Sequence, residues 1–545
     1  MLEPQGSDYI WIVVVGFILA FVLAFGIGAN DVANSFGTSV GSKVLTLKQA
    51  CVIATIFEVA GAILIGARVS DTVRKGIIDI NSFNGTEELA MMGSLSALTG
   101  TSVWLLIATF FNLPVSGTHS VVGATMGFAL VAHGLSGVKW PTFGKIAGSW
   151  VISPIMSGIV SSLIFIFVDK TILKKEESFE SGLKFLPLFY AFTITINLFS
   201  VFYKGSQVLG FHKIPLYGVF ILTFGGGLLT ALFVKIWVAP YMRRRIIHEV
   251  ACSEDVGAVI CSPTESPDDN LAVEIVTSNG NCKNATPEKV PLEKTSKTDS
   301  SACNGEALSP AETDLETSRI STNTILSGSP TDEKQLIEDD SPIPPHEHHE
   351  HHIRNVRLRT YSMGMQVPDH EIKVLDEPKT GKLFAFLQIM TACFGGFAHG
   401  GNDVSNCIGP LISLWTIFYS GYIQQKVDIP VWILFYGGAG ISIGLWVWGR
   451  RVIKTVGEDL TPITPTSGFT IEIGSAITVL IASNLGIPIS TTHCKVGSVV
   501  MVGRVRAKES VDWTIFRNVV LAWLVTMPVA GALSAVSYLG LRELV

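Results

Sequence analysis

Apolar runs of about 20 residues recur along the whole sequence and decide what kind of fold it can adopt. A helix of about 20 residues crosses roughly 30 Å of hydrocarbon, and these runs are too many and too long for the core of a soluble protein. The composition agrees, because 48% of the residues are hydrophobic and only 15% are charged. We therefore expect an all-α polytopic membrane protein. The runs begin at Tyr9, Thr46, Met91, Lys145, Leu186, Pro215, Leu383, Pro430, Phe469 and Thr514.

Charge and cysteine usage exclude several other classes of protein. The first run lacks a basic leading segment, so we expect a retained span rather than a cleaved signal peptide. The net charge of −6 comes without a basic stripe, which argues against a nucleic-acid partner. No disulfide framework is expected, because no cysteine falls in a loop that we place outside the cell.

An Asn-Asp-Val-x-Asn motif occurs twice, at 30–34 and at 402–406, each time at the end of an apolar run. A carboxylate inside a bilayer costs roughly 2.5 to 3.5 kcal/mol on insertion scales, so an intramembrane aspartate indicates a functional site. Asp31 and Asp403 occupy matching places, which suggests one site built from two copies. The alternative is a pair of glycine-rich helix ends whose polar side chains are satisfied.

A second motif is also duplicated, as Pro-Val-Ser-Gly-Thr-His at 114–119 and Pro-Ile-Ser-Thr-Thr-His at 488–493. Proline, glycine and hydroxyl residues at this point predict a break in the backbone, which frees amides and carbonyls to meet a ligand. The alternative is a packing kink with satisfied hydroxyls. The repeat extends further, through the pairs Gly61 and Gly444, Gly66 and Gly449, Arg68 and Arg451, Gly123 and Gly497, Trp150 and Trp523, and Pro154 and Pro528.

These repeats divide the chain into four parts. We expect an N-terminal transmembrane repeat at 1–168, two extra transmembrane helices at 186–240, a polar loop at 241–382 and a C-terminal repeat at 383–545. The number of crossings between the repeats is odd whether the broken segments cross the membrane or form re-entrant hairpins. The second repeat is therefore inverted, and inverted repeats with broken helices are the architecture of secondary transporters.

Positive charge gives the same orientation, because basic residues gather on one predicted side, which is then the cytoplasm. Both termini and Asn84 fall on the extracellular side, and Asn84-Gly85-Thr86 is a glycosylation acceptor pattern there. The basic residues are Lys174, Lys175, Arg243, Arg244, Arg245, Arg354, Arg357, Arg450, Arg451, Arg504 and Arg506.

The loop at 241–382 is rich in polar residues and poor in aromatic ones, so we expect it to be disordered and cytoplasmic. It contains a His-rich tract at 346–352. We favour a solvated low-complexity run over a metal site, because a disordered stretch sets no ligand geometry.

The two Pro-Ser-Thr-His breaks suit an anion. Hydroxyls and unpaired amides at a helix start favour negative charge, and a tetrahedral oxyanion has many acceptor oxygens to satisfy. Helix-start amides alone would also suit a carboxylate. The candidate anion-binding residues are Asp31, Asn34, Ser116, Gly117, Thr118, Asp403, Asn406, Ser490, Thr491 and Thr492.

Oxygen-bearing side chains near the same motifs suit a hard cation such as Na⁺, and a cation beside the anion lowers the desolvation cost of both. Glu58 and Glu472 are further cation ligands, proton carriers or neutral hydrogen-bonding groups. The candidate cation ligands are Asn30, Asp31, Glu58, Asn402, Asp403 and Glu472. We expect His119, His399 and His493 to support the site from nearby, with His399 tuning ion coupling because it lies three residues before Asn402.

The twin Asn-Asp and Pro-Ser-Thr-His motifs together resemble the inorganic phosphate transporter family, the type III sodium–phosphate cotransporters. The resemblance covers both transmembrane halves. It implies plasma-membrane uptake of monovalent phosphate with two Na⁺, an inward movement of one net positive charge, no cofactor, and a homodimer with about twelve membrane segments per subunit.

The family's functional positions map onto residues in this chain. Its essential acidic and hydroxyl positions fall on Asp31, Glu58, Ser116, Asp403, Glu472 and Ser490. Its sodium-coupling histidine falls on His399 and its glycosylated asparagine on Asn84. The long loop fits the animal-type members, although it is shorter than in many of them.

Other functions remain open at this point. A proton-driven or sulfate-selective carrier on the same fold is the closest alternative, and an anion channel is the next. A membrane enzyme acting on phosphate esters is disfavoured, because the histidines are not arranged with Asp or Cys as a nucleophile–base pair.

Overall fold

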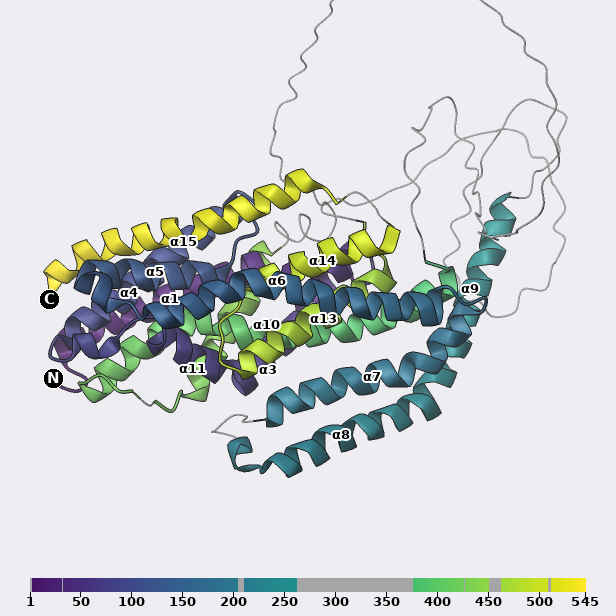
Figure 1. The fold of residues 1–545 in the computed structure, drawn as a ribbon, viewed down its shortest axis with the longest axis horizontal. Helices are drawn as coiled ribbons and strands as arrows, with labels where there is room; N and C mark the ends of the chain where they lie inside the picture. Colours follow the sequence, from purple (N-terminus) through teal and green to yellow (C-terminus); the bar gives the residue numbers. More distant parts are fainter. Residues whose placement is uncertain are drawn as a thin grey trace, which may run out of the picture. The chain divides into compact units, whose positions relative to one another are not determined.

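The computed structural model describes residues 2–31, 33–203, 210–261, 376–425, 427–449, 462–507 and 511–545, which belong to one compact unit (Figure 1). Throughout these ranges the regular structure is helical, apart from one isolated bridge between Ile78 and Val138. Within the described residues, eleven helices are long and apolar enough to cross a membrane. The prediction of an all-α polytopic membrane protein is confirmed.

The helices of the first half are α1 (Ile10–Asp31), α2 (Ala33–Gly41), α3 (Leu47–Lys75), α4 (Glu87–Phe110), α5 (Gly117–His133) and α6 (Trp140–Val168). Between the halves lie α7 (Ser178–Phe202), α8 (Leu216–Phe233) and α9 (Ala239–Cys261). The second half contains α10 (Pro378–Ser420), α11 (Val431–Trp448), α13 (Pro465–Asn484), α14 (Thr491–Ala507) and α15 (Trp513–Leu541).

Several helices extend beyond the apolar runs that predicted them. α7 begins at Ser178 rather than near Leu186, and α9 continues to Cys261, past the start expected for the polar loop. Polar residues continue these helices beyond the apolar segment, because amphipathic or charged turns are stable at a membrane surface. The loop between 262 and 375, its His-rich tract, and the arginines at 354, 357, 450 and 451 lie outside the described residues.

Local capping explains where key helices start. The Thr46 hydroxyl accepts a hydrogen bond from Gln49 N, and the Gln49 side chain bonds back to Thr46 N, which forms a capping box for α3. Thr464 and Ser467 form the same arrangement at the start of α13. Each box satisfies backbone donors that a helix start otherwise leaves free.

The two halves pack around each other with their roles exchanged. α1 packs against α11, while α3, the counterpart of α11, packs against α10, the counterpart of α1. The counterparts of α4, α5 and α6 are α13, α14 and α15. In the same way α5 packs against α15 as α14 packs against α6, and α4 packs against α15 as α13 packs against α6. Every major contact between the halves therefore has a partner with the halves swapped, as a pseudo-two-fold relation requires.

The first long helices of the halves run in opposite directions. The segment before α1 bonds to the end of α10, through Leu2 N to Gly421 O at 2.8 Å and Gln5 N to Phe418 O at 2.9 Å. The start of α1 thus lies beside the end of α10, and Figure 1 shows both chain termini at one end of the helices. This arrangement is compatible with the inverted repeats that the sequence predicts.

Glycines allow the closest contacts between the halves. A Cβ atom on Gly28 would lie 1.8 Å from Ile441 O, and one on Gly400, its counterpart, would lie 2.1 Å from Glu58 O. A backbone can approach another this closely only where the residue facing it has no side chain, which is the role of the glycine in each pair. The repeated glycines of the sequence therefore mark the contacts between the repeats.

The α4–α5 and α13–α14 pairs are hairpins whose tips carry the duplicated Pro-Ser-Thr-His segments, and Ser116 and Ser490 within them are buried. Both ends of α4–α5 lie near the N-terminal end of the molecule, since Tyr9 Oη bonds Glu88 Oε1 at 3.3 Å and Gly137 O accepts from Asp79 N at 3.0 Å. At the other ends of α13 and α14, Arg506 Nη1 reaches Pro462 O at 3.3 Å. Parity could not distinguish hairpins from crossings, and the structure shows hairpins.

Candidate functional site

The two Asn-Asp motifs converge at the tips of the two hairpins. Asp31 at the end of α1, and His399 and Asp403 in the middle of α10, bring potential ligand atoms within 4.8 Å of one another. All three side chains are buried. The residues that the duplicated motif singled out therefore do form a single group.

The first asparagine of each motif holds the hairpin tip of its own half. Asn30 Nδ2 donates to Leu113 O at 2.9 Å, and Asn30 Oδ1 accepts from Val115 N at 3.1 Å. Asn402 Nδ2 donates to Ile489 O at 2.9 Å. These contacts satisfy backbone groups that the proline breaks leave without a helical partner.

The hairpin tips also bond to each other, in two equivalent ways. Thr118 Oγ1 donates to Ile489 O at 3.1 Å, and Thr492 Oγ1 donates to Val115 O at 3.2 Å. Each half therefore completes the site of the other, and neither half could form it alone.

The second asparagine of each motif reaches the threonine of the opposite hairpin. Asn34 Nδ2 lies 2.9 Å from Thr492 Oγ1, and Asn406 Nδ2 lies 3.3 Å from Thr118 Oγ1. Asn406 Nδ2 also donates to Asp403 Oδ1 at 2.8 Å. The predicted anion-binding amides and hydroxyls are thus already organised by one another.

Two buried oxygens at this place have no hydrogen-bond partner among the described residues, namely Asp31 Oδ2 and Asn406 Oδ1. Gly117 approaches both side chains, because a Cβ atom there would lie 3.0 Å from Asp31 Oδ2 and 3.3 Å from Asn406 Nδ2. On the opposite side Thr491 Oγ1 donates to Asp403 Oδ2 at 2.9 Å. Unpaired buried acceptors are costly, so this site is chemically suited to a cation.

Ser116 and Ser490 cap the two helices that start at the tips. Ser116 Oγ accepts from His119 N at 3.3 Å, and Ser490 Oγ accepts from His493 N at 3.2 Å. Each hydroxyl keeps its proton available for another acceptor. The positive ends of α5 and α14 therefore both point toward the centre of the molecule, where an anion would be stabilised.

His399 connects the central group to Glu58 of α3. Its Nδ1 lies 2.7 Å from Glu58 Oε2, and its Nε2 lies 3.3 Å from Asp403 Oδ2. Ser35 Oγ lies 3.4 Å from the other oxygen of Glu58. The imidazole of His399 therefore connects Glu58 to the group formed by Asp31 and Asp403.

Glu472 of α13 lies in a separate polar cluster. Its carboxylate accepts from Thr38 Oγ1 and Ser39 Oγ, both at 2.6 Å, from Thr391 Oγ1 at 2.7 Å and from Gln388 Nε2 at 3.3 Å. These donors come from α2 and α10, so the carboxylate connects the α13–α14 hairpin to both of these helices.

His119 and His493 lie against each other beyond the tips. Their rings are 4.4 Å apart, and each packs on a tryptophan, with Trp150 at 3.8 Å from His119 and Trp523 at 3.7 Å from His493. They do not belong to the aspartate group. Their contacts instead join the start of each hairpin's second helix to α6 and α15.

The sequence from 27 to 534 matches the model of the Phosphate transporter family. The chain belongs to this family. It is 41% identical to sodium-dependent phosphate transporter 1 of Homo sapiens, over 97% of this chain and 95% of that protein. It is 42% identical to sodium-dependent phosphate transporter 2 of Bos taurus, over 97% of each. A solved structure entitled "The sodium-dependent phosphate transporter" superimposes with a TM-score of 0.70 at 30% identity, covering 98% of this chain and all of that one.

Two buried residues near Glu472 were not among the site residues predicted from the sequence of this phosphate transporter. Lys495 in α14 is buried, its Nζ has no hydrogen-bond partner among the described residues, and its charge interacts with that of Glu472. Gln388 donates to the same carboxylate. Lys495 could have been found, because it is a charged residue two positions after a motif histidine within an apolar segment.

Asn84 lies at the surface, directly after the short helix Ile80–Phe83. Gly85 follows with φ of 89°, a conformation that favours glycine. The asparagine is therefore accessible in the folded family member, at the same end as the chain's N-terminus.

Proposed function

We propose that this protein is a symporter that carries monovalent inorganic phosphate into the cell with two Na⁺ ions. The observation that carries the proposal is the buried group of Asp31, His399 and Asp403 at the meeting point of two hairpin tips. Similarity to proteins named sodium-dependent phosphate transporters supports the choice of substrate and ion.

Phosphate would bind at the hairpin tips. Ser116 and Ser490 offer hydroxyl protons there, beside the positive ends of α5 and α14. Thr118, Thr491, Thr492 and the amides of Asn34 and Asn406 would exchange some of their present mutual hydrogen bonds for phosphate oxygens. The monovalent form carries protons that Asp31 or Asp403 can accept in a hydrogen bond, which gives an aspartate a role toward an anion.

Sodium would bind to the oxygen acceptors that lie around the same tips. Asp31 Oδ2 and Asn406 Oδ1 have no partner among the described residues, and Asp403 supplies a second carboxylate. Glu58 would act through His399, whereas Glu472, with its four donors, would serve a separate cation position. Asn30 and Asn402 would contribute only by giving up part of their contacts with the tips.

Placing cations and anion together explains the coupling physically. Each ion is expensive to bury alone, and each lowers the cost of burying the other. Two Na⁺ with one monovalent phosphate carry one net positive charge. The membrane potential would then add roughly 2.3 kcal/mol per 100 mV to the drive for uptake.

The experiment is phosphate uptake by purified protein in liposomes, with sodium, lithium and proton gradients imposed separately. We expect saturable uptake that requires sodium and is accelerated by an inside-negative potential. Asp31→Asn and Ser490→Ala proteins that insert normally should lose it. Uptake that is unchanged without sodium, or that follows a proton gradient alone, would refute the coupling. Competition by sulfate but not arsenate would indicate a sulfate carrier, and current without saturation an anion channel.

We further propose a plasma-membrane location with both termini outside the cell, a homodimer, no enzymatic activity, and glycosylation of Asn84. Counting the helices between Asn84 and Arg243 puts Arg243 to Arg245 on the opposite side of the membrane from Asn84. The positive-inside rule then supports a cytoplasmic position for these arginines. Antibody access to tags at the termini of intact cells tests this orientation.

A further inference from the structure

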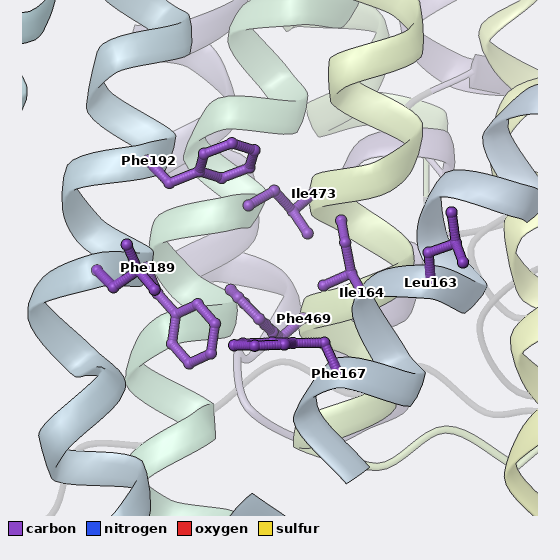
Figure 2. A pocket seen from close by; sticks show the side chains of 8 residues that line it. Leu163, Ile164, Phe167, Phe189, Phe192, Phe469 and Ile473 are labelled. Carbon is purple, nitrogen blue, oxygen red and sulfur yellow. The ribbon is translucent and has the colours of Figure 1, made fainter. Parts of the chain in front are cut away.

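An apolar pocket lies between α6, α7 and α13, away from the polar centre (Figure 2). Its volume is about 300 Å³. Since a water-sized group takes about 30 Å³ in a liquid, a methylene chain of on the order of ten groups would fill it. Protein interiors rarely leave such space empty. The lining residues are Leu163, Ile164, Phe167, Leu188, Phe189, Phe192, Phe469 and Ile473.

The pocket opens toward the lipid side of the helices. Leu163 and Leu188 are 62% and 53% exposed, whereas Phe469 and Ile473 at the back are buried. Figure 2 shows Phe192 directed toward Ile473, and the ring centroids of Phe189 and Phe469 lie 5.1 Å apart. The natural solvent of this surface is hydrocarbon, so its occupant is expected to be an apolar chain.

Two lysines lie at one end of the pocket. On α7, Lys184 and Leu188 are four residues apart and share a face of the helix. Lys170 follows Phe167 by three residues in the turn Asp169–Leu173 that continues α6. Since a short turn connects these antiparallel helices, both lysines lie on the same side of the pocket.

These lysines are available for an anion. Both are exposed, and neither makes an ion pair with another described residue. Nearby acidic groups are already engaged, since Asp169 pairs with Lys174 at 2.6 Å and Glu180 with Arg243 at 2.8 Å. Glu176 and Glu177 are exposed residues of the connection between the helices.

We propose that the pocket binds one acyl chain of an anionic phospholipid whose phosphate contacts Lys170 and Lys184. The apolar lining selects a chain, and the two lysines at its mouth select a negative headgroup. In the orientation proposed above, this end of the pocket lies in the cytoplasmic leaflet, which holds the anionic lipids. The lipid chain would contact Phe469 and Ile473, which flank Glu472 in α13. This proposal does not rest on the transport function.

The test is photolabelling of the full-length protein in liposomes by phosphatidylserine with a diazirine on one acyl chain, followed by peptide mapping. We expect saturable labelling of the α6 and α7 peptides that line the pocket. Unlabelled phosphatidylserine should compete about tenfold better than phosphatidylcholine, because each lysine near a headgroup favours the anion.

Matched variants separate the two parts of the site. Lys170→Gln with Lys184→Gln should abolish the preference for phosphatidylserine, while Lys175→Gln, an exposed lysine in the same connection, should keep it. Leu188→Trp should reduce labelling several-fold, whereas Leu229→Trp, on the exposed surface of α8, should not. Equal competition by phosphatidylcholine, a preference that survives loss of both lysines, or cross-links mainly to a second subunit would overturn the proposal.

Discussion

His399 Nδ1 lies 2.7 Å from Glu58 Oε2, so a buried imidazole of the second half is bonded to a buried carboxylate of the first. The other nitrogen of the same ring lies 3.3 Å from Asp403 Oδ2. A change at Glu58 is therefore transmitted to the central aspartates through a single side chain.

Glu58→Gln should weaken sodium dependence more than phosphate binding. Glutamine keeps a hydrogen-bonding group but removes the charge. Since a hydrogen bond to a charged group contributes about 1.5 to 3 kcal/mol and a neutral one about 1 kcal/mol, the sodium concentration for half-maximal uptake should rise about fivefold or more. The measurement is uptake against sodium concentration at saturating phosphate. Glu88→Gln is the control, because it removes the charge of a carboxylate that only accepts from Tyr9 Oη at 3.3 Å, far from the central aspartates along the chain. An unchanged sodium curve for Glu58→Gln would contradict the role given to this pair.

Asn30→Ala should destabilise the fold as well as impair transport. It leaves Val115 N without its acceptor and Leu113 O without one donor, and each unsatisfied buried group costs about 1 to 3 kcal/mol. Thermal unfolding in detergent should show a clear drop in midpoint, and Asn402→Ala should behave similarly. A transport defect with full stability would instead indicate that Asn30 acts only on an ion.

Gly28→Ala and Gly400→Ala should each lower the thermal midpoint strongly. A Cβ at these positions would lie 1.8 and 2.1 Å from backbone oxygens, and overpacking costs about 1 to 3 kcal/mol even where side chains can move. Gly225→Ala in α8 meets no atom within 4 Å and should be neutral or stabilising. If all three variants melt alike, close backbone packing between the halves does not contribute to stability.

Glu472 and Lys495 should be energetically coupled. Removing one buried charge leaves the other less compensated. Since no direct ion pair joins the two among the described residues, the effect should be smaller than the cost of about 3 to 5 kcal/mol for a close buried pair. Glu472→Gln and Lys495→Met should each be destabilising, and the double variant should lose less than the sum of the two. A double-mutant cycle on unfolding midpoints measures the coupling, and strict additivity would exclude it.

Asn84→Gln should remove a glycan. The asparagine is exposed, and its sequon is complete. Protein made in animal cells should migrate faster on a gel after the substitution, as wild-type protein does after glycosidase treatment. Identical mobility before and after enzyme treatment of the wild type would show that the site is unused.

The sequence predicted that Asp31 and Asp403 lie together, because the signal for it is local. Asp31 and Asp403 each stand in a short motif within an apolar run, and the duplication implied that they meet. The proline breaks likewise appeared where predicted. What each motif residue contacts could not be predicted, since Asn30 holds a backbone more than 80 positions away.

The polar cluster around Glu472 could not be predicted from the sequence for a related reason. Its donors Thr38, Ser39, Gln388 and Thr391 belong to no repeated motif, and they meet only because α2, α10 and α13 pack together. Helix ends were also missed, since hydropathy does not report the polar turns that lengthen α7 and α9.

The glycine crossings show that Glu58 corresponds to Ile441, and the Asn-Asp motifs align His399 with Ile27. The backbones of the two halves are therefore closely equivalent, while Glu58 and His399 have no ionisable counterpart in the other half. If the two halves exchange conformations during a transport cycle, the outward-open and inward-open states differ in free energy by the contribution of these unmatched groups. A few side chains, rather than the symmetric backbone, would then decide whether the resting protein is open to the outside or to the inside of the cell.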